Sequence, residues 1–177
     1  KLCGLKEPAK GRLEEDGEFI FLGSAVTHRQ VAASPLVRKY APVLARAAGE
    51  LGSPAIRTMG TVGGNIVTAS PAGDTLTPLY VLDAAVETRS LDGFRITPLK
   101  RFIRGPGATA LRAGEILYGI WIPKGQRQGV HHFEKVGRRR GPTISLASLA
   151  SILHLSGEGD IEAVRLAWGS VGPTVVT

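Results

Sequence analysis

The chain has 177 residues, of which 43% are hydrophobic and 21% charged, a balance that excludes wholesale disorder and suffices for a buried core. No stretch approaches the roughly 18 apolar residues that a membrane-spanning helix needs, so no membrane span is expected. The net charge of +7 favours anionic partners: phosphorylated ligands, nucleic acid or acidic protein surfaces.

The cysteine and histidine content argues against a metal centre or a nucleophilic active site. The one cysteine, Cys3, cannot form an internal disulfide, which makes a reducing, cytoplasmic setting the default. None of the four histidines forms a helical i, i+4 metal pair with a nearby acid. No Ser/His/Asp or Cys/His set is spaced for nucleophilic catalysis, so we expect no catalytic residue and no metal ligand. The absence of an initial methionine suggests a processed or trimmed product.

The first elements are predicted from turn and cap signals. Residues 10–23 are typical of a β-hairpin. Thr27-His28-Arg29-Gln30 has the spacing of a capping box, which predicts a helix that begins at Thr27. Ser34-Pro35 predicts a second helix start, with serine as the cap and proline at the first helical position. The apolar spacing over 42–51 predicts a third helix, which Gly52 ends.

The middle of the chain is less regular. Residues 57–74 fit neither a helical nor a strand period, although Asp74 is placed to cap a helix that runs through Leu82. Ala85–Arg89 and Phe94–Thr97 are predicted as two strands joined by a tight turn. Glu115–Ile122 is predicted as a further strand.

A polar, glycine-bearing stretch at 124–129 is predicted to be a linker between a mixed first domain, 1–123, and a β-rich second domain, 130–177. Three long strands are expected after the linker: Val130–Val136, Ile144–Leu155 and Ile161–Val171. No covering helices follow them, so one face of this antiparallel sheet is expected to be bare. These elements indicate an α+β fold.

Gly63-Gly64 is the most informative pair of residues. Adjacent glycines let successive backbone N–H groups line one concavity and approach a phosphate closely, and the flanking Thr61 and Asn65 add a hydroxyl and an amide. The alternative is a tight turn with glycines at positive φ. The spacing matches neither a dinucleotide-binding fingerprint nor a P-loop.

Charged side chains leave further alternatives open. Asp74 is either a helix cap or an acceptor for ligand hydroxyl groups. Lys135 and the run Arg138-Arg139-Arg140 offer positive charge to nucleic acid, but no aromatic residues interleave the arginines, so a solvated or subunit-facing cluster is favoured. His131-His132 is read as strand surface, and Leu51 and Leu117 as core residues.

Residues 59–74 closely resemble the second flavin motif of the molybdenum hydroxylases, the FAD subunits of the xanthine dehydrogenase and carbon monoxide dehydrogenase family. The resemblance extends over nearly the whole chain through the segments 23–28, 52–57, 89–93, 114–117, 133–139 and 169–174. It implies the second lobe of an FAD-binding domain of the PCMH type, followed by a truncated antiparallel β-sheet C-terminal domain. The family's first lobe, with its own glycine-rich phosphate loop, has no counterpart here, so the chain is expected to be the middle of a larger subunit.

The resemblance also implies which residues contact FAD. The T-[IV]-G-G-N turn contacts the diphosphate and ribityl region, the aspartate of the S-P-A-G-D turn bonds the flavin side, and a leucine, a lysine and an often aromatic residue lie beside the flavin. The matching residues here are Thr61, Val62, Gly63, Gly64, Asn65, Asp74, Leu117, Lys135 and Leu51.

By the same resemblance, a molybdenum–pterin large subunit oxidises the substrate, and [2Fe–2S] clusters on a small subunit pass electrons to FAD and on to NAD or another acceptor. Three alternatives remain: another flavoprotein such as a cell-wall precursor reductase, a basic nucleic-acid-binding module, and a trimmed partner-binding fragment without FAD. The S-P-A-G-D turn and residues 133–139 argue against the first, and the arginine run without aromatic residues argues against the second.

Overall fold

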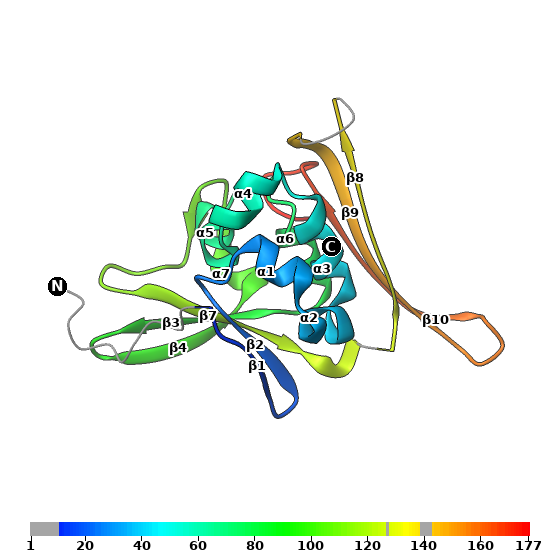
Figure 1. Cartoon of the computed structure of the whole chain (residues 1–177), viewed down its shortest axis with the longest axis horizontal. Helices are drawn as coiled ribbons and strands as arrows, with labels where there is room; N and C mark the ends of the chain where they lie inside the picture. The colour runs from blue at the N-terminus through cyan, green and yellow to red at the C-terminus, as the bar shows by residue number, and fades with distance from the viewer. Residues whose placement is uncertain (1–10, 127, 139–142) are drawn as a thin grey trace.

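The computed structural model describes residues 11–126, 128–138 and 143–177. Short helices lie between two antiparallel sheets, one of five strands and one of three (Figure 1). This arrangement confirms the α+β class. Within the described residues, no helix is long and apolar enough to cross a membrane.

The larger sheet has the strand order β1-β2-β7-β3-β4, with every neighbouring pair antiparallel. Both predicted hairpins and the later strand are confirmed. The strands are β1 (Leu13–Asp16), β2 (Phe19–Gly23), β3 (Ala85–Ser90), β4 (Gly93–Pro98) and β7 (Ile116–Pro123). A two-stranded ribbon, β5 (Ile103–Gly105) with β6 (Ala108–Thr109), lies outside this sheet.

The cap signals place the first helices correctly. Thr27 and Gln30 form both bonds of the capping box, and Ser34 caps the next helix with Pro35 in its first turn. Gly52 adopts a φ of 48° after the third helix, which confirms the predicted stop. These helices are α1 (His28–Ala33), α2 (Pro35–Tyr40) and α3 (Pro42–Glu50).

No helix was predicted between Gly52 and Asp74, where the structure has two short helices, α4 (Pro54–Met59) and α5 (Val62–Thr68). Ser53 and Thr61 cap them through side-chain oxygens. The helices α6 (Leu76–Val81) and α7 (Leu99–Phe102) follow.

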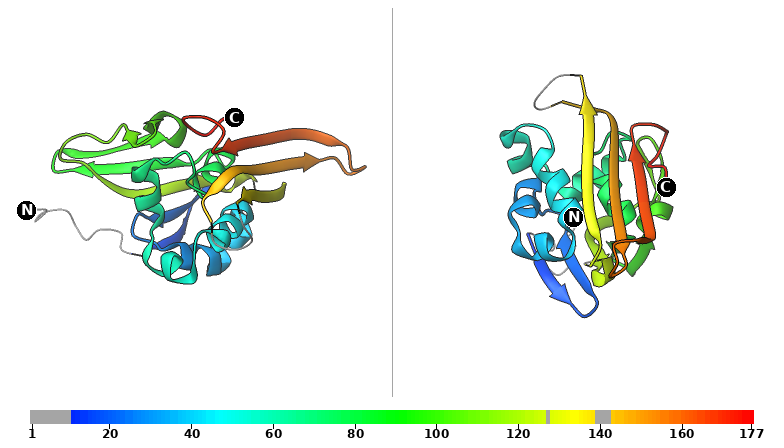
Figure 2. Two further views of the ribbon diagram at one scale, coloured as in Figure 1. Left: turned by 90° about the horizontal axis from the view of Figure 1, so that it is seen from above. Right: turned by 90° about the vertical axis from the view of Figure 1, so that its right-hand side faces the viewer.

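The smaller sheet has the order β10-β9-β8 and consists of β8 (Val130–Gly137), β9 (Ser145–Leu155) and β10 (Ile161–Gly169). A 3₁₀ turn, Lys124–Gln126, precedes it. Its inner face packs on α3 and α6, and its buried residues belong to the same core cluster as those of the larger sheet. The right-hand view of Figure 2 turns the outer face toward the reader. Exposed apolar residues on that face are Val130, Val136, Val164, Leu166 and Trp168.

Candidate functional site

A cavity of about 780 Å³ opens where the helical layer meets the three-stranded sheet. Its helical side comes from the end of α3, from α4 and α5, and from the turn before α6; its other side comes from the start of β9 and the residue after β8. The lining residues are Leu51, Gly52, Ile56, Asn65, Ala72, Asp74, Arg138, Thr143, Ile144, Ser145 and Leu146. The volume and the mixture of apolar walls with a few polar groups are typical of small-molecule sites.

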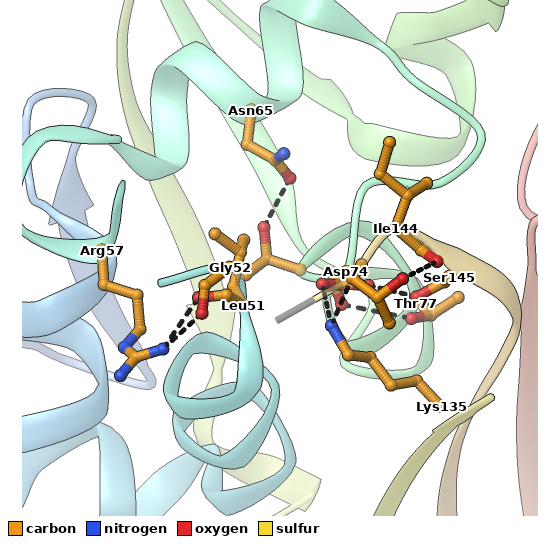
Figure 3. A network of polar contacts seen from close by, with 11 residues as sticks. Leu51, Gly52, Arg57, Asn65, Asp74, Thr77, Lys135, Ile144 and Ser145 are labelled. Atoms are coloured by element: carbon orange, nitrogen blue, oxygen red, sulfur yellow. Dashed lines mark hydrogen bonds and ion pairs between the residues drawn. The ribbon is translucent and has the colours of Figure 1, made fainter. Parts of the chain in front are cut away.

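The Asp74 carboxylate is the polar centre of this cavity (Figure 3). Lys135 Nζ donates to Asp74 Oδ2 at 2.8 Å, and Ser145 Oγ donates to Asp74 Oδ1 at 2.6 Å. The side chains of Asp74 and Lys135 are only 7% and 10% exposed. Lys135 Nζ also lies 3.4 Å from the carbonyl oxygen of Thr143. Both carboxylate oxygens therefore bind residues of the three-stranded sheet.

Asp74 is not the cap of α6, contrary to the helix-cap alternative. Thr75 occupies the N-cap position of that helix, and no side chain makes a cap hydrogen bond there. The partners of Asp74 lie 61 and 71 residues further along the chain, so tertiary contacts decide the direction of its side chain.

The two glycines at 63 and 64 form neither a nest of free amides nor a turn at positive φ. They lie in the first turn of α5. The Gly63 amide donates to Ser24 O at 3.0 Å, and the Gly64 amide donates to Thr61 Oγ1 at 3.0 Å. The phosphate-nest interpretation is wrong for these amides, because protein oxygens already accept their hydrogens.

Close packing explains why glycine is needed at 63. A Cβ atom there would lie 2.5 Å from Ser24 O. Gly64 is exposed, and a Cβ atom there would lie 3.1 Å from Thr61 Oγ1. The start of α5 is thus fixed against residues 24–28, and one function of the pair is structural.

His28 lies behind this turn and is 2% exposed. Its ring approaches Gly60, since a Cβ atom on Gly60 would lie 3.2 Å from His28 Cδ2. Its buried Nδ1 has no hydrogen-bond partner within the described part of the chain. Burial lowers the pKa of His28 below its ordinary 6.5, and the negative charge of Asp74 acts in the opposite direction.

Residues 9–125 match the model of the family described as the FAD binding domain in molybdopterin dehydrogenase. The chain belongs to this family. It is 34% identical to the xanthine dehydrogenase FAD-binding subunit of Escherichia coli O157:H7 over 166 residues, which cover 93% of this chain and 56% of that protein. It is 35% identical to the nicotine 6-hydroxylase medium subunit of Paenarthrobacter nicotinovorans over 162 residues, with coverages of 92% and 56%.

The fold likeness agrees with this assignment. The structure superposes on carbon monoxide dehydrogenase from Hydrogenophaga pseudoflava with a TM-score of 0.89 and 27% identity, covering 96% of this chain and 58% of that one. The chain therefore spans somewhat more than half the length of the relatives that it matches.

The structure places only part of the predicted FAD set on the cavity wall. Leu51, Asn65 and Asp74 line it, and Lys135 reaches it through Asp74. Leu117 is 8% exposed, belongs to the main core cluster and is not among the lining residues of the cavity, so its contact with FAD stays a prediction. The predicted contacts of the turn before Asn65 also stay predictions; its residues are Thr61, Val62, Gly63 and Gly64.

Sequence reasoning missed several residues of the cavity wall in this FAD-binding domain. Ser145 is the clearest, because it is 5% exposed and bonded to Asp74. Its position next to exposed Ile144 at the start of a strand gave no local signal. Arg57 was also missed; its Nη1 donates to the carbonyl oxygens of Leu51 and Gly52 at 3.0 and 2.7 Å and thereby fixes the rim.

Of the predicted basic run Arg138-Arg139-Arg140, the structure describes the first residue. Arg138 lines the cavity and supplies positive charge at its mouth. Arg139 and Arg140 lie outside the described residues. His131 is partly buried and its Nε2 lies 2.8 Å from the carbonyl oxygen of Gln126, so the surface interpretation is only partly correct for this histidine.

Proposed function

We propose that this chain is the FAD-carrying electron-transfer component of a molybdenum hydroxylase complex. The observation that carries the proposal is the cavity of about 780 Å³ around Asp74, in a chain that belongs to the FAD-binding family. The relatives named for xanthine dehydrogenase and nicotine 6-hydroxylase support an oxidoreductase, and not a nucleic-acid-binding module.

The lining fits a flavin in chemical character. Apolar side chains of Leu51, Ile56 and Ile144 offer a surface for a flat ring system and exclude water, while Asn65 provides an amide for hydrogen bonding. Arg138 adds a positive charge that suits a diphosphate. The chemistry that FAD supplies when bound is redox: electrons are taken up singly and passed on as a pair.

The chain's own residues bind and orient the cofactor and set the electrostatics around it. No catalytic residue is predicted in this chain. The Lys135 ammonium group balances the charge of the Asp74 carboxylate on the cavity wall, which leaves Arg138 as the lining residue whose charge favours a ligand that becomes more negative on reduction. The proposed partners are a molybdenum–pterin large subunit and a [2Fe–2S] small subunit, with NAD or another carrier as the electron acceptor.

Calorimetric titration of the chain with FAD tests the proposal. The chain is expected to bind one FAD, and Ala72→Trp, which fills the cavity, is expected to weaken binding by about tenfold or more. Ala55→Trp is the matched control, because Ala55 is exposed on α4 and does not line the cavity. Failure of the chain to bind FAD, with salt-sensitive binding to duplex DNA instead, would favour the nucleic-acid alternative.

A further inference from the structure

The turn before α6 is held by all three strands of the smaller sheet. Lys135 in β8 and Ser145 in β9 bind the two oxygens of Asp74. Immediately after β10, the Ser170 amide donates to Pro71 O at 3.0 Å. The last residue of β10, Gly169, packs so tightly here that a Cβ atom would lie 2.9 Å from Thr77 Cγ2. We call this set of contacts between the turn and the sheet the seam.

The charged contact at the seam is buried in the structure. When the seam is closed, the Asp74 and Lys135 side chains are almost excluded from water and pair at 2.8 Å. Separating them while they stay buried is very unfavourable, because each charge would lose both water and partner. The pair is therefore released only when the sheet moves far enough from the turn for water to reach both groups.

The cavity lies across this seam. Asn65, Ala72 and Asp74 line it from the helical side, whereas residues 143–146 line it from the start of β9. Withdrawal of β9 from the turn removes one whole wall of the cavity. A ligand that contacts both walls consequently binds the closed form better than the open form, and differential binding of this kind shifts the equilibrium toward closure.

We propose that Lys135 and Ser145 are positioning residues: through Asp74 they close the three-stranded sheet over the cavity, and closure and cavity occupancy stabilise each other. The identity of the occupant as FAD rests on the function proposed above, but the lock itself is a property of the chain without ligand. The coupling is reciprocal, so whatever weakens the lock also lowers the apparent affinity once the open form is populated.

Amide hydrogen exchange of the chain without ligand tests the lock. Ser145→Ala is expected to speed exchange in β8 and β9 by about tenfold or more, the loss expected for a hydrogen bond to a charged group. Lys135→Met is the second variant. Exchange in β2 and β7, which lie in the other sheet, is expected to change much less.

Glu134→Gln is the matched control, because Glu134 neighbours Lys135 on β8 and pairs with Arg46 of α3 at 3.8 Å, but both side chains are exposed. If Ser145→Ala and Lys135→Met exchange like Glu134→Gln, or if exchange rises equally in both sheets, the lock is overturned. A regional response supports it, since a general loss of stability does not select one sheet.

Saturation with FAD tests the coupling. FAD is expected to slow exchange in β8 and β9 of the native chain and to suppress most of the additional exchange that Ser145→Ala introduces there. FAD that binds but protects only the helical side would overturn the coupling while leaving the proposed function intact. If FAD does not bind, the proposed function fails, and the ligand-free comparison still decides whether the lock exists.

Discussion

Two glycine-bearing segments lead into cavity-lining residues, the first into Asn65 and the second through Ala72 and Asp74, and they are held by different forces. The first, 60–64, packs by backbone against residues 24–28, with the Gly63 amide bonded to Ser24 O. The second, 70–75, is held by a buried charge and by strands that follow it by 61 residues or more. The first turn should therefore respond to added volume and the second to loss of charge.

The two turns are joined at one point beside the cavity. Thr75 Oγ1 donates to Asn65 Oδ1 at 2.7 Å, so the end of the second turn orients the amide that follows the first. Because Asn65 and Asp74 both line the cavity, a disturbance of either turn reaches its wall. Stability and flavin affinity have to be measured together to separate the two turns.

The largest effect is expected for Asp74→Ala, which removes the charge that holds the second turn. Among the described residues, the substitution leaves the Lys135 ammonium group with Thr143 O, at 3.4 Å, as its one remaining acceptor. Breaking a buried pair in this way typically costs about 3–5 kcal/mol of unfolding free energy. Urea denaturation of the chain measures this loss.

Glu134→Ala is the control for Asp74→Ala, since it removes an exposed carboxylate whose pairing contributes about 0–1 kcal/mol. Equal losses for the two substitutions would mean that the seam contributes no more than a surface contact. The second turn would then not be held by its buried charge.

The next largest effect is expected for Gly63→Ala, which adds volume to the first turn. The new Cβ atom would lie 2.5 Å from Ser24 O, and the Ser24 backbone has little freedom to move because its amide is bonded to Tyr118 O at 3.0 Å. We expect a loss of about 1–3 kcal/mol, as for other overpacked sites. A thermal unfolding midpoint equal to that of the native chain would show that the segment at 24–28 yields easily.

The sequence was sufficient to predict the parts of the fold that depend on local chemistry. Capping residues at 27 and 34 fix where α1 and α2 begin, and glycine turns fix the hairpins β1–β2 and β3–β4. The helices α4 and α5 were missed because each is only six or seven residues long, and Gly63-Gly64 breaks the apolar period. Short helices of this kind form through caps and tertiary contacts.

The candidate site was only partly predictable for a related reason. Asp74 could be singled out from its motif, but its direction depends on Lys135 and Ser145, whose proximity follows from the folding of the second sheet onto the first turns. Likewise, the sequence predicted a close approach of a phosphate at Gly63, whereas the structure shows a close approach of protein backbone. The atom that approaches it is Ser24 O, and no local pattern identifies that partner.

A smaller effect is expected from pH, through His28 and His131. Burial lowers the pKa of His28 behind the first turn and of His131 in β8. Below about pH 6.5 the unfolded chain takes up protons that the native histidines resist, so the unfolding free energy falls as the pH is lowered. Each group contributes at most one proton, or about 1.4 kcal/mol per pH unit.

Urea denaturation between about pH 5 and about pH 8, a range that includes the ordinary histidine pKa, tests this expectation. His28→Asn and His131→Asn should each flatten the acidic side of the stability curve, and the double substitution should flatten it further. A curve for His28→Asn that is parallel to that of the native chain would show that His28 takes up its proton equally in both states.

The smallest change in stability is expected for Gly64→Ala, and it separates the packing of the first turn from its predicted contact with FAD. Gly64 is exposed, and the gain of about 1 kcal/mol from replacing a helical glycine is opposed by a Cβ contact of 3.1 Å with Thr61 Oγ1. The net change should stay within about 1 kcal/mol, as for Gly157→Ala, where a Cβ atom meets nothing within 4 Å. If close approach at 64 serves the cofactor, FAD affinity falls by about tenfold in Gly64→Ala and not in Gly157→Ala; unchanged affinity would leave the turn a purely structural role.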